Sequence, residues 1–388
     1  MSTHASPSRV ALAALLALFL AAPGPAAGAP PSPLDSGLFA FPGAFDHPFS
    51  AFSASVALAD AWLGDDPCGN PAVTGAGAIR VSPALVRVSR QDLRADNRNY
   101  DETPAFVDGA SASIVGNSET IAGFAYVCQP VVRLEDNAYS RGTGSVNPGP
   151  PPAVIQSATT MREIRAGIGI APSFGPVRFG AAIEYTWRDD EYELLEESGS
   201  PESGLRHVEF SGEGIGASFG ASWRPAGRVA VAGSARLLAA LDLEGEQRLE
   251  LFSGDSVAAI TGKRHGTWEG GVSARIAAAE GLAVLVGLGA RAEEVWVGLD
   301  SRAGPCYQGA VGLDYRLPES DWSVRFGLGH EQQTDVPEPR AMRVALGVGW
   351  DLDGMILDFG VVRRSFHHGA DSPISYDDRI LLTARFDF

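Results

Sequence analysis

The sequence predicts an all-β protein, a transmembrane antiparallel β-barrel of about fourteen strands with an N-terminal plug (hatch) in its lumen. Three observations lead to this fold class. Strand-length segments with one apolar face recur along the chain, short and long connections alternate between them, and an export signal precedes them. Each strand of a membrane barrel has one face toward lipid and one toward a polar lumen, which produces this pattern.

Residues 1–29 form the predicted export signal. Arg9 precedes the apolar run VALAALLALFLAA, which is too short to span a bilayer as a helix, and small residues follow in PGPAAGAP. This is the pattern of a cleaved secretory signal peptide. No long uninterrupted apolar segment follows, so no transmembrane helix is expected. The formal net charge of -17 argues against nucleic acid as a partner.

Residues 30–76 form the predicted plug. The segment has a different character from the rest of the chain because it is rich in phenylalanine: Phe39, Phe41, Phe45, Phe49 and Phe52. An exported segment with this much aromatic surface is not expected to stay in water. We expect it to fold into the lumen, either as a purely structural closure or as a part that handles a ligand.

Residues 77–388 form the predicted barrel, and the last segment, SYDDRILLTARFDF, shows its pattern. Ile380 and Leu382 fall on one face, and Asp377 and Arg379 on the other, because side chains alternate along a strand. The same alternation recurs in RFGAAIEYTWR, GEGIGASFGASW, CYQGAVGLDYRL, DWSVRFGLGHE and AMRVALGVGWDL. We interpret the apolar face as the one that meets lipid.

The connections between these segments are of two kinds. Tight turns are predicted at GNSE, SFGP, RPAGR, AAEG, PESD and DLDG. Longer loops are predicted at 92–104, 138–156, 189–204, 245–265, 300–304, 334–340 and 367–375. Short turns at one end and long loops at the other are typical of barrels in the outer membrane of Gram-negative bacteria, which is the predicted location.

Aromatic residues support this location. Six tryptophans are expected near strand ends on the lipid face, as an aromatic girdle: Trp187, Trp223, Trp268, Trp296, Trp322 and Trp350. Phe386 and the terminal Phe388 resemble the C-terminal signal that the barrel assembly machinery reads. The predicted partners are therefore outer-membrane lipid and that machinery.

The opposite, polar face carries glycines and charges. Glycines at alternate strand positions leave room in a lumen for a plug or a ligand. The charges expected to face the lumen are Glu184, Arg236, Glu269, Arg275, Arg291, Glu293, Asp314, Arg316, Arg325, Arg343 and Asp358. We interpret them as mutually paired charges of a wet interior rather than as acid–base catalysts. The histidines show no metal-ligand spacing, so no enzyme, cofactor or metal site is predicted.

Three cysteines, Cys68, Cys128 and Cys306, are an odd number for an exported chain. At most one intramolecular pair can form, and the sequence does not identify it. The weak spacing favours no structural disulfide.

Several segments together resemble one family. ADAWLGDDPCGNPAVTG is similar to the N-terminal hatch of the FadL-type long-chain fatty acid transporters, with Asn70, Pro71 and Ala72 matching the Asn-Pro-Ala turn of that hatch. TPAFVDGASASIVGNSETIAGFAYVCQPVVRLED, FSGEGIGASFGASWRPAGRVAVAGSARL and DYRLPESDWSVRFGLGHEQQ resemble later parts of the same barrel. The resemblance implies a fourteen-stranded barrel, closed by a hatch, that carries hydrophobic compounds inward. The family also includes divergent relatives that serve as barrels of secretion systems.

Pro130 lies inside the predicted third strand, where it cannot donate to the ladder. A closed barrel has no free edge, so we expect a kink or bulge there. The family resemblance implies that a kink in this strand opens the barrel sideways. The alternative is a proline near the outer rim, where strand pairing has already ended.

The predicted function is passive uptake of a hydrophobic small-molecule ligand. The outer loops contain no long apolar helical hairpin, so a fatty acid is not the predicted substrate. The alternative is a barrel that does not transport but scaffolds a secretion system or docks secreted proteins. A plain aqueous porin is disfavoured by the predicted plug.

Overall fold

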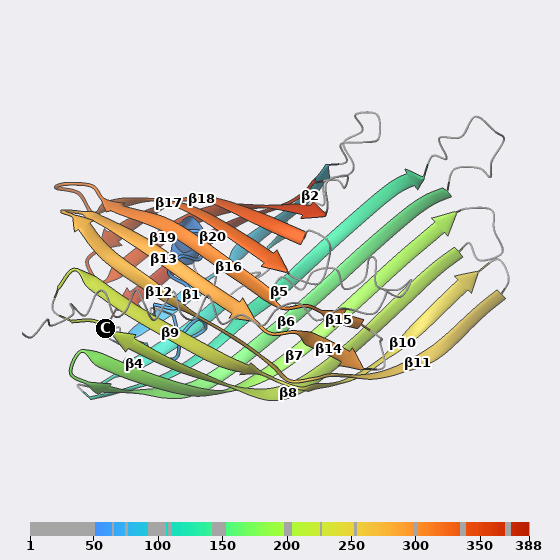
Figure 1. Ribbon diagram of the computed structural model, residues 1–388, viewed down its shortest axis with the longest axis horizontal. Coiled ribbons are helices and arrows are strands. Elements are labelled where there is room, and N and C mark those ends of the chain that lie inside the picture. The colour runs from blue at the N-terminus through green and yellow to red at the C-terminus, as the bar shows by residue number, and fades with distance from the viewer. Residues whose placement is uncertain are drawn as a thin grey trace, which may run out of the picture. The chain divides into compact units, whose positions relative to one another are not determined.

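The computed structural model describes residues 51–63, 66–73, 77–91, 106–107, 111–118, 120–141, 153–197, 204–225, 227–251, 254–297, 301–333, 339–368 and 374–387. Within these residues the chain forms a closed antiparallel barrel of 14 wall strands (Figure 1). Some wall strands consist of two consecutive segments. The elements are α2 (Ala51–Ser55), β1 (Ala78–Ser82), β2 (Ala84–Gln91), β3 (Phe106–Val107), β4 (Ser111–Asn117), β5 (Ile121–Arg141), β6 (Ala153–Phe174), β7 (Val177–Glu197), β8 (Gly204–Trp223), β9 (Val229–Leu238), β10 (Leu241–Leu251), β11 (Gly254–Arg264), β12 (Thr267–Ala279), β13 (Leu282–Arg291), β14 (Glu294–Val297), β15 (Ser301–Ala303), β16 (Cys306–Arg316), β17 (Trp322–Gln333), β18 (Pro339–Leu352), β19 (Met355–His368) and β20 (Ile374–Asp387).

The last strand closes the barrel against the first. β20 pairs with β1, β2 and β19, and every pairing in the sheet is antiparallel. Pro83 divides the first wall strand into β1 and β2, because proline has no N–H for the ladder; its carbonyl still accepts a bond from Leu382 N at 3.2 Å. This closure confirms the predicted barrel of about fourteen strands.

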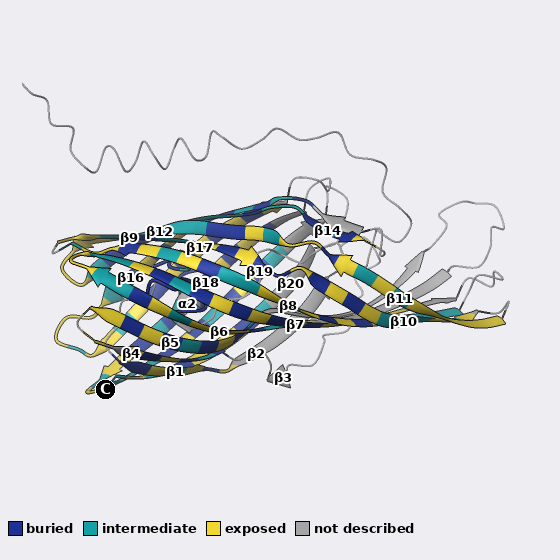
Figure 2. Ribbon diagram, turned by 90° about the horizontal axis from the view of Figure 1, so that it is seen from below, coloured by how far each residue is buried: buried dark blue, intermediate teal, exposed yellow. Residues whose placement is uncertain are grey.

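Burial alternates along the strands, as Figure 2 shows by the alternation of exposed and buried positions. In β7, Ile183 is 66% exposed while its neighbour Glu184 is 1% exposed. The outward apolar positions of this strand run from Phe179 to Trp187. About nine residues of a tilted strand span the hydrocarbon core of a bilayer. A continuous exposed apolar belt of this height identifies the outer surface as the face that meets lipid.

Tryptophans border this belt, with one exception. Trp322 and Trp350 lie next to the short turns and stack with their ring centroids 5.0 Å apart, and both are exposed. Trp187, Trp223 and Trp268 are also exposed. Trp296 was predicted for the girdle, and this prediction was wrong, since it is 1% exposed.

A break in the strand alternation explains the position of Trp296. Between β13 and β14 the chain makes an irregular step, in which Ala292 N donates to Trp268 O at 2.9 Å. Arg291 and Glu294 are both buried on either side of this step. The step therefore moves Trp296 from the outward to the inward set of positions.

The strands continue into segments that the sequence predicted to be loops. β5 and β6 remain paired out to Arg141 and Ala153, and β10 pairs with β11 out to Leu251 and Gly254. In Figure 1 the strands β5 to β8, β10 and β11 extend farther than their orange neighbours. Beyond the bilayer both faces of a strand can be polar, so hydrophobic alternation disappears there while the backbone ladder persists. No helix in the described part of the chain is long and apolar enough to cross a membrane.

Candidate functional site

The inner face of the barrel contacts an N-terminal segment, residues 51–63 and 66–73, which we call the inner segment. Its helix α2 packs against β18, β19 and β20. Most of the segment is fully buried, including Val56, Ala59, Leu63 and Cys68. Phe52 is partly buried, and the Arg325 guanidinium lies 4.3 Å from its ring centroid. The predicted plug residues Phe39, Phe41, Phe45 and Phe49 lie outside the described residues.

Asn70 organises the end of the inner segment. Its side-chain Oδ1 accepts a hydrogen bond from Ala72 N at 2.8 Å, which forms an Asx-type turn over Pro71. Its Nδ2 donates to Trp62 O at 2.6 Å and to Gly233 O at 3.1 Å. One buried amide therefore joins two parts of the segment and connects them to strand β9. This explains in physical terms why asparagine stands in the Asn-Pro-Ala turn.

Inward glycines of the wall create the space for this segment. A Cβ at Gly180 would collide with the Pro71 carbonyl group, and one at Gly220 would collide with Asn70 Oδ1. Other inward glycines have the same relation to the segment: Gly271 to Trp62, Gly287 to Ala59, and Gly312 and Gly327 to Val56. The alternating glycines in the sequence are thus positions where backbone passes directly against the wall.

Polar side chains of the wall hold the segment by its backbone. Arg178 Nη1 donates to Val73 O at 2.6 Å, Arg224 Nη2 to Leu63 O at 2.8 Å, Ser234 Oγ to Gly69 O at 2.8 Å, and Arg236 Nη2 to Cys68 O. Because the inner segment has little regular secondary structure, these donors satisfy carbonyls that would otherwise be buried without partners.

Beside the inner segment, charged side chains from several strands meet in the lumen. Arg236 on β9 contacts Glu184 on β7 at 2.9 Å and Glu269 on β12 at 2.8 Å. Arg165 on β6 also contacts Glu269, at 2.9 Å. The Tyr126 hydroxyl donates to Glu184. None of these side chains has more than a few per cent of its surface exposed, so the lumen is filled at this level.

The same network continues toward the end of the barrel where the long loops lie. Glu163 accepts from Arg165 at 2.7 Å and from Arg264 at 2.8 Å. The Arg188 guanidinium lies 4.5 Å from the centroid of Trp296, which is why this tryptophan is buried in a charged interior. We call the ten connected side chains the lumenal ion cluster: Glu163, Arg165, Glu184, Arg188, Asp190, Arg236, Arg264, Glu269, Arg291 and Glu294.

The lumenal ion cluster has equal numbers of acidic and basic groups. Each charge is in contact with an opposite charge, as buried charges require. Removing one member of such a buried group leaves an uncompensated charge and costs about 3–5 kcal/mol. The cluster is therefore well suited to hold strands β6, β7, β9 and β11–β14 in fixed relation and to exclude free ions from this part of the lumen.

Sequence reasoning found only part of this cluster. It named Glu184, Arg236, Glu269 and Arg291, and it placed Glu293 in the lumen. The structure instead buries Glu294, in contact with Arg291 at 2.8 Å, because of the step between β13 and β14. Five other members were missed: Glu163 and Arg165, Arg188 at the end of RFGAAIEYTWR, and Asp190 and Arg264, which lie in segments predicted as loops. Inward spacing of charges at i and i+2 was the available signal for Glu163 and Arg165.

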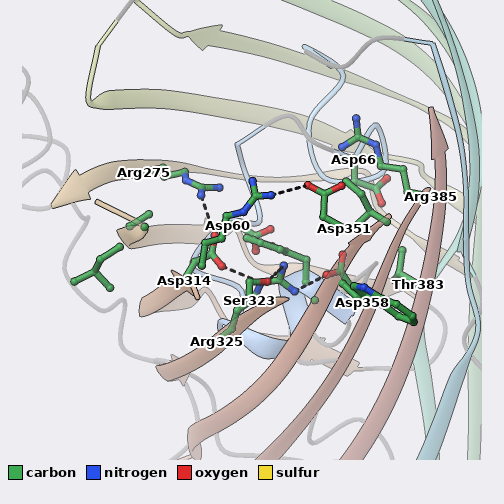
Figure 3. Close-up of a pocket in the computed structure, with 18 of the residues that line it drawn as sticks. Asp60, Asp66, Arg275, Asp314, Ser323, Arg325, Asp351, Asp358, Thr383 and Arg385 are labelled. Carbon is green, nitrogen blue, oxygen red and sulfur yellow. Dashed lines mark hydrogen bonds and ion pairs between the residues drawn. The ribbon is translucent and has the colours of Figure 1, made fainter. Parts of the chain in front are cut away.

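A polar cavity of about 530 Å³ lies near the short turns, bordered by the inner segment and by β12, β16, β17 and β19 (Figure 3). Asp314 accepts from Arg275 at 2.8 Å and from Arg325 at 3.1 Å, and Arg325 also contacts Asp358 at 2.5 Å. Asp60 and Asp66 of the inner segment line it as well. Of the charges predicted to face the lumen, Arg275, Asp314, Arg325 and Asp358 are thus paired in the structure. Arg316 also lines the cavity, near the turns, with 59% of its side chain exposed. Arg343 lies elsewhere and contacts Glu331 at 2.6 Å.

Pro130 lies where the ladder of β5 and β6 is interrupted. The register shifts between Cys128 and Val131, which marks a β-bulge or irregularity at this point of the strand. On its other side, β5 pairs with β4 only as far as Cys128, opposite Ser111. Beyond this point the described residues give β5 paired neighbours on one side alone.

Of the C-terminal aromatics, Phe386 is 45% exposed on the outer face, and Phe388 lies outside the described residues.

The described residues contain no group of three or more His, Cys, Asp or Glu side chains suited to hold a metal ion. The arrangement of fixed ion pairs and buried backbone is that of a filled membrane barrel.

Comparison with known proteins supports this class at the level of the fold. No protein-family model and no curated protein sequence matches the chain. Solved structures do match. The Ralstonia pickettii toluene transporter TbuX has a TM-score of 0.66 at 13% identity, over 89% of this chain and 99% of that one. A Pseudomonas aeruginosa FadL homologue has a TM-score of 0.63 at 13% identity, with the same coverage, and the CymD monoaromatic hydrocarbon channel has 0.62 at 13%, over 88% and 97%. The chain shares the barrel fold of FadL-type hydrophobic-compound channels.

Proposed function

We propose that this chain is a divergent FadL-type channel of the outer membrane that takes up hydrophobic small molecules passively. The observation that carries the proposal is the fold, which matches these channels over nearly their whole length, from 97% to 99%. The exposed apolar belt supports a membrane location, and the predicted signal peptide at 1–29 supports export.

In this proposal residues 30–76 act as a plug that closes the lumen. The contacts of the inner segment support it: Asn70 bonds to the wall, and the Arg178, Arg224 and Arg236 side chains hold segment carbonyls. The lumenal ion cluster fills the space next to the segment. Together they would prevent solutes and ions from crossing the barrel.

The proposed route for an apolar molecule leaves the lumen sideways, at Pro130. Along the barrel axis, an apolar molecule would have to pass the inner segment and then the charged cavity around Arg325. It would break hydrogen bonds and ion pairs there and could not replace them. The register shift between Cys128 and Val131 supports a side opening there, since within the described residues β4 pairs with β5 only as far as Cys128. In this proposal the apolar molecule diffuses into lipid at this irregular point of the wall.

The experiment is to replace Pro130 by Val and to measure uptake of hydrophobic compounds. Restoring a ladder bond contributes about 0.5–1.5 kcal/mol, so the barrel should assemble in both forms while uptake falls. Pro172→Val is the matched control, because Pro172 lies on the adjacent strand in regular register with Ile121. Uptake should be unchanged in the control.

Two results would change the interpretation. A fall in uptake for both variants would mean that the route does not depend on Pro130. Equal uptake in the wild type, the Pro130→Val variant and a deletion strain would contradict transport. The alternative, a barrel that scaffolds or docks secreted proteins, would then be favoured.

A further inference from the structure

Two of the three cysteines meet where the inner segment touches the wall. Cys68 on the segment and Cys128 on β5 belong to one buried core cluster, at 0% and 1% exposure. Both are free thiols in the structure, and burial together with the neighbouring Cys128 thiol raises the pKa of Cys68. Cys306 lies in a different cluster, and its Sγ is 3.5 Å from Glu331 Oε1.

Hydrogen bonds fix the backbone at both cysteines. Cys68 N donates to Asp66 Oδ1 at 3.0 Å, and Cys68 O accepts from Arg236. Cys128 is the last ladder position of β5 before the register shift, paired with Ser111 on one side and Arg165 on the other. Hydrogen bonds therefore fix the backbone at both positions, within one buried cluster.

We propose that Cys68 and Cys128 form a disulfide that fastens the inner segment to β5 directly before the Pro130 bulge. The bond requires the two neighbouring thiols to approach to a sulfur–sulfur distance of about 2.05 Å. The inference rests on the proposed export, because disulfides persist in oxidising compartments such as the periplasm.

The bond forms by exchange with a disulfide-bearing thiol oxidoreductase or a small disulfide such as oxidised glutathione. The thiolate of one cysteine attacks the donor disulfide and releases one donor thiol. The second cysteine, as its thiolate, then attacks the mixed disulfide and releases the other. The chain loses two electrons and two protons, and the donor is reduced to a dithiol (oxidoreductase) or to two thiols (glutathione). Because burial raises the pKa of the seated Cys68 thiol, the exchange takes place before the segment is fully enclosed.

The tether has a consequence for the plug. With residue 68 bonded to the wall, the Asn-Pro-Ala turn beside it cannot leave the lumen, and only the chain before Cys68 can move freely. An opening next to Pro130 would then arise with the plug still in place.

The test counts reactive thiols in purified chain refolded into detergent with a mixture of oxidised and reduced glutathione. This measurement does not depend on cellular location or on transport. The denatured product is treated with N-ethylmaleimide and weighed by mass spectrometry. We expect one modified cysteine, Cys306, before reduction and three after it, and a linked peptide containing residues 68 and 128.

Variants make the result specific. Cys306→Ser should keep the linked peptide, whereas Cys128→Ser should lose it while still giving a folded barrel. Three modified thiols in the folded, unreduced wild type would overturn the proposal, and so would a linked peptide that contains Cys306. Failure of the uptake experiment at Pro130 with an intact 68–128 link would contradict only the transport function.

Discussion

Replacing Asn70 by Ala should release the inner segment from its seat. The substitution removes three hydrogen bonds: one from Ala72 N, one to Trp62 O and one to Gly233 O. At about 0.5–1.5 kcal/mol each, the seated state loses about 1.5–4.5 kcal/mol relative to the released state. Since about 1.4 kcal/mol is tenfold in an equilibrium constant, the released fraction should rise about ten-fold or more. The barrel ladder is unaffected, so the heat-induced unfolding of the barrel should change little.

The assay is the conductance of the purified barrel in planar bilayers, measured with a reductant present so that no disulfide holds the segment. Brief openings should become more frequent in the Asn70→Ala variant. Asn70→Asp keeps the acceptor for Ala72 N but turns a carboxylate toward two carbonyl oxygens, so its effect should be at least as large. Gln332→Ala, which truncates an exposed amide on β17, is the control and should match the wild type. Wild-type conductance in both Asn70 variants would refute the argument that this amide holds the segment.

Three further predictions concern the segment and the wall. Gly220→Val should raise conductance because the valine side chain would collide with Asn70. Gly123→Val is the control and should not raise it, since nothing lies within 4 Å of a Cβ at Gly123. Equal effects of the two substitutions would contradict the argument that Gly220 makes room for the inner segment. Deleting residues 30–74 should leave the barrel assembled and more permeable to small solutes, and unchanged conductance would mean that these residues do not close the lumen. Epitope tags inserted within 142–152 should be accessible on intact cells and tags in RPAGR should not, and the reverse pattern would contradict the orientation.

The sequence predicted the wall well because the two faces of each wall strand lie in different environments. Ile183 meets lipid and Glu184 meets the lumen, so the alternation of residue type directly reports the strand and its faces. Outside the bilayer this contrast disappears. The outer halves of β10 and β11 therefore resembled loops, although Leu251 and Gly254 are still paired.

The candidate site was only partly predictable, because it depends on irregular steps and on which strands curve toward each other. Arg264 and Glu163 are 101 positions apart in the sequence, and no local pattern indicates that they form an ion pair. Trp296 and Glu294 were misplaced by a single irregular step, which reverses the inward and outward positions that follow. By contrast, the register shift beside Pro130 could be expected from the missing N–H of proline alone.

The central claim is that hydrophobic molecules enter the cell through this barrel. The most direct test follows the uptake of a labelled panel, comprising a long-chain fatty acid, toluene and a polar sugar, by cells with the chain, by a deletion strain and by the complemented deletion. The account predicts faster uptake of at least one apolar compound in the presence of the chain, loss of that uptake in the deletion strain, and no effect on the sugar. Equal uptake of every apolar compound in all strains, with the barrel present at normal levels, would contradict it.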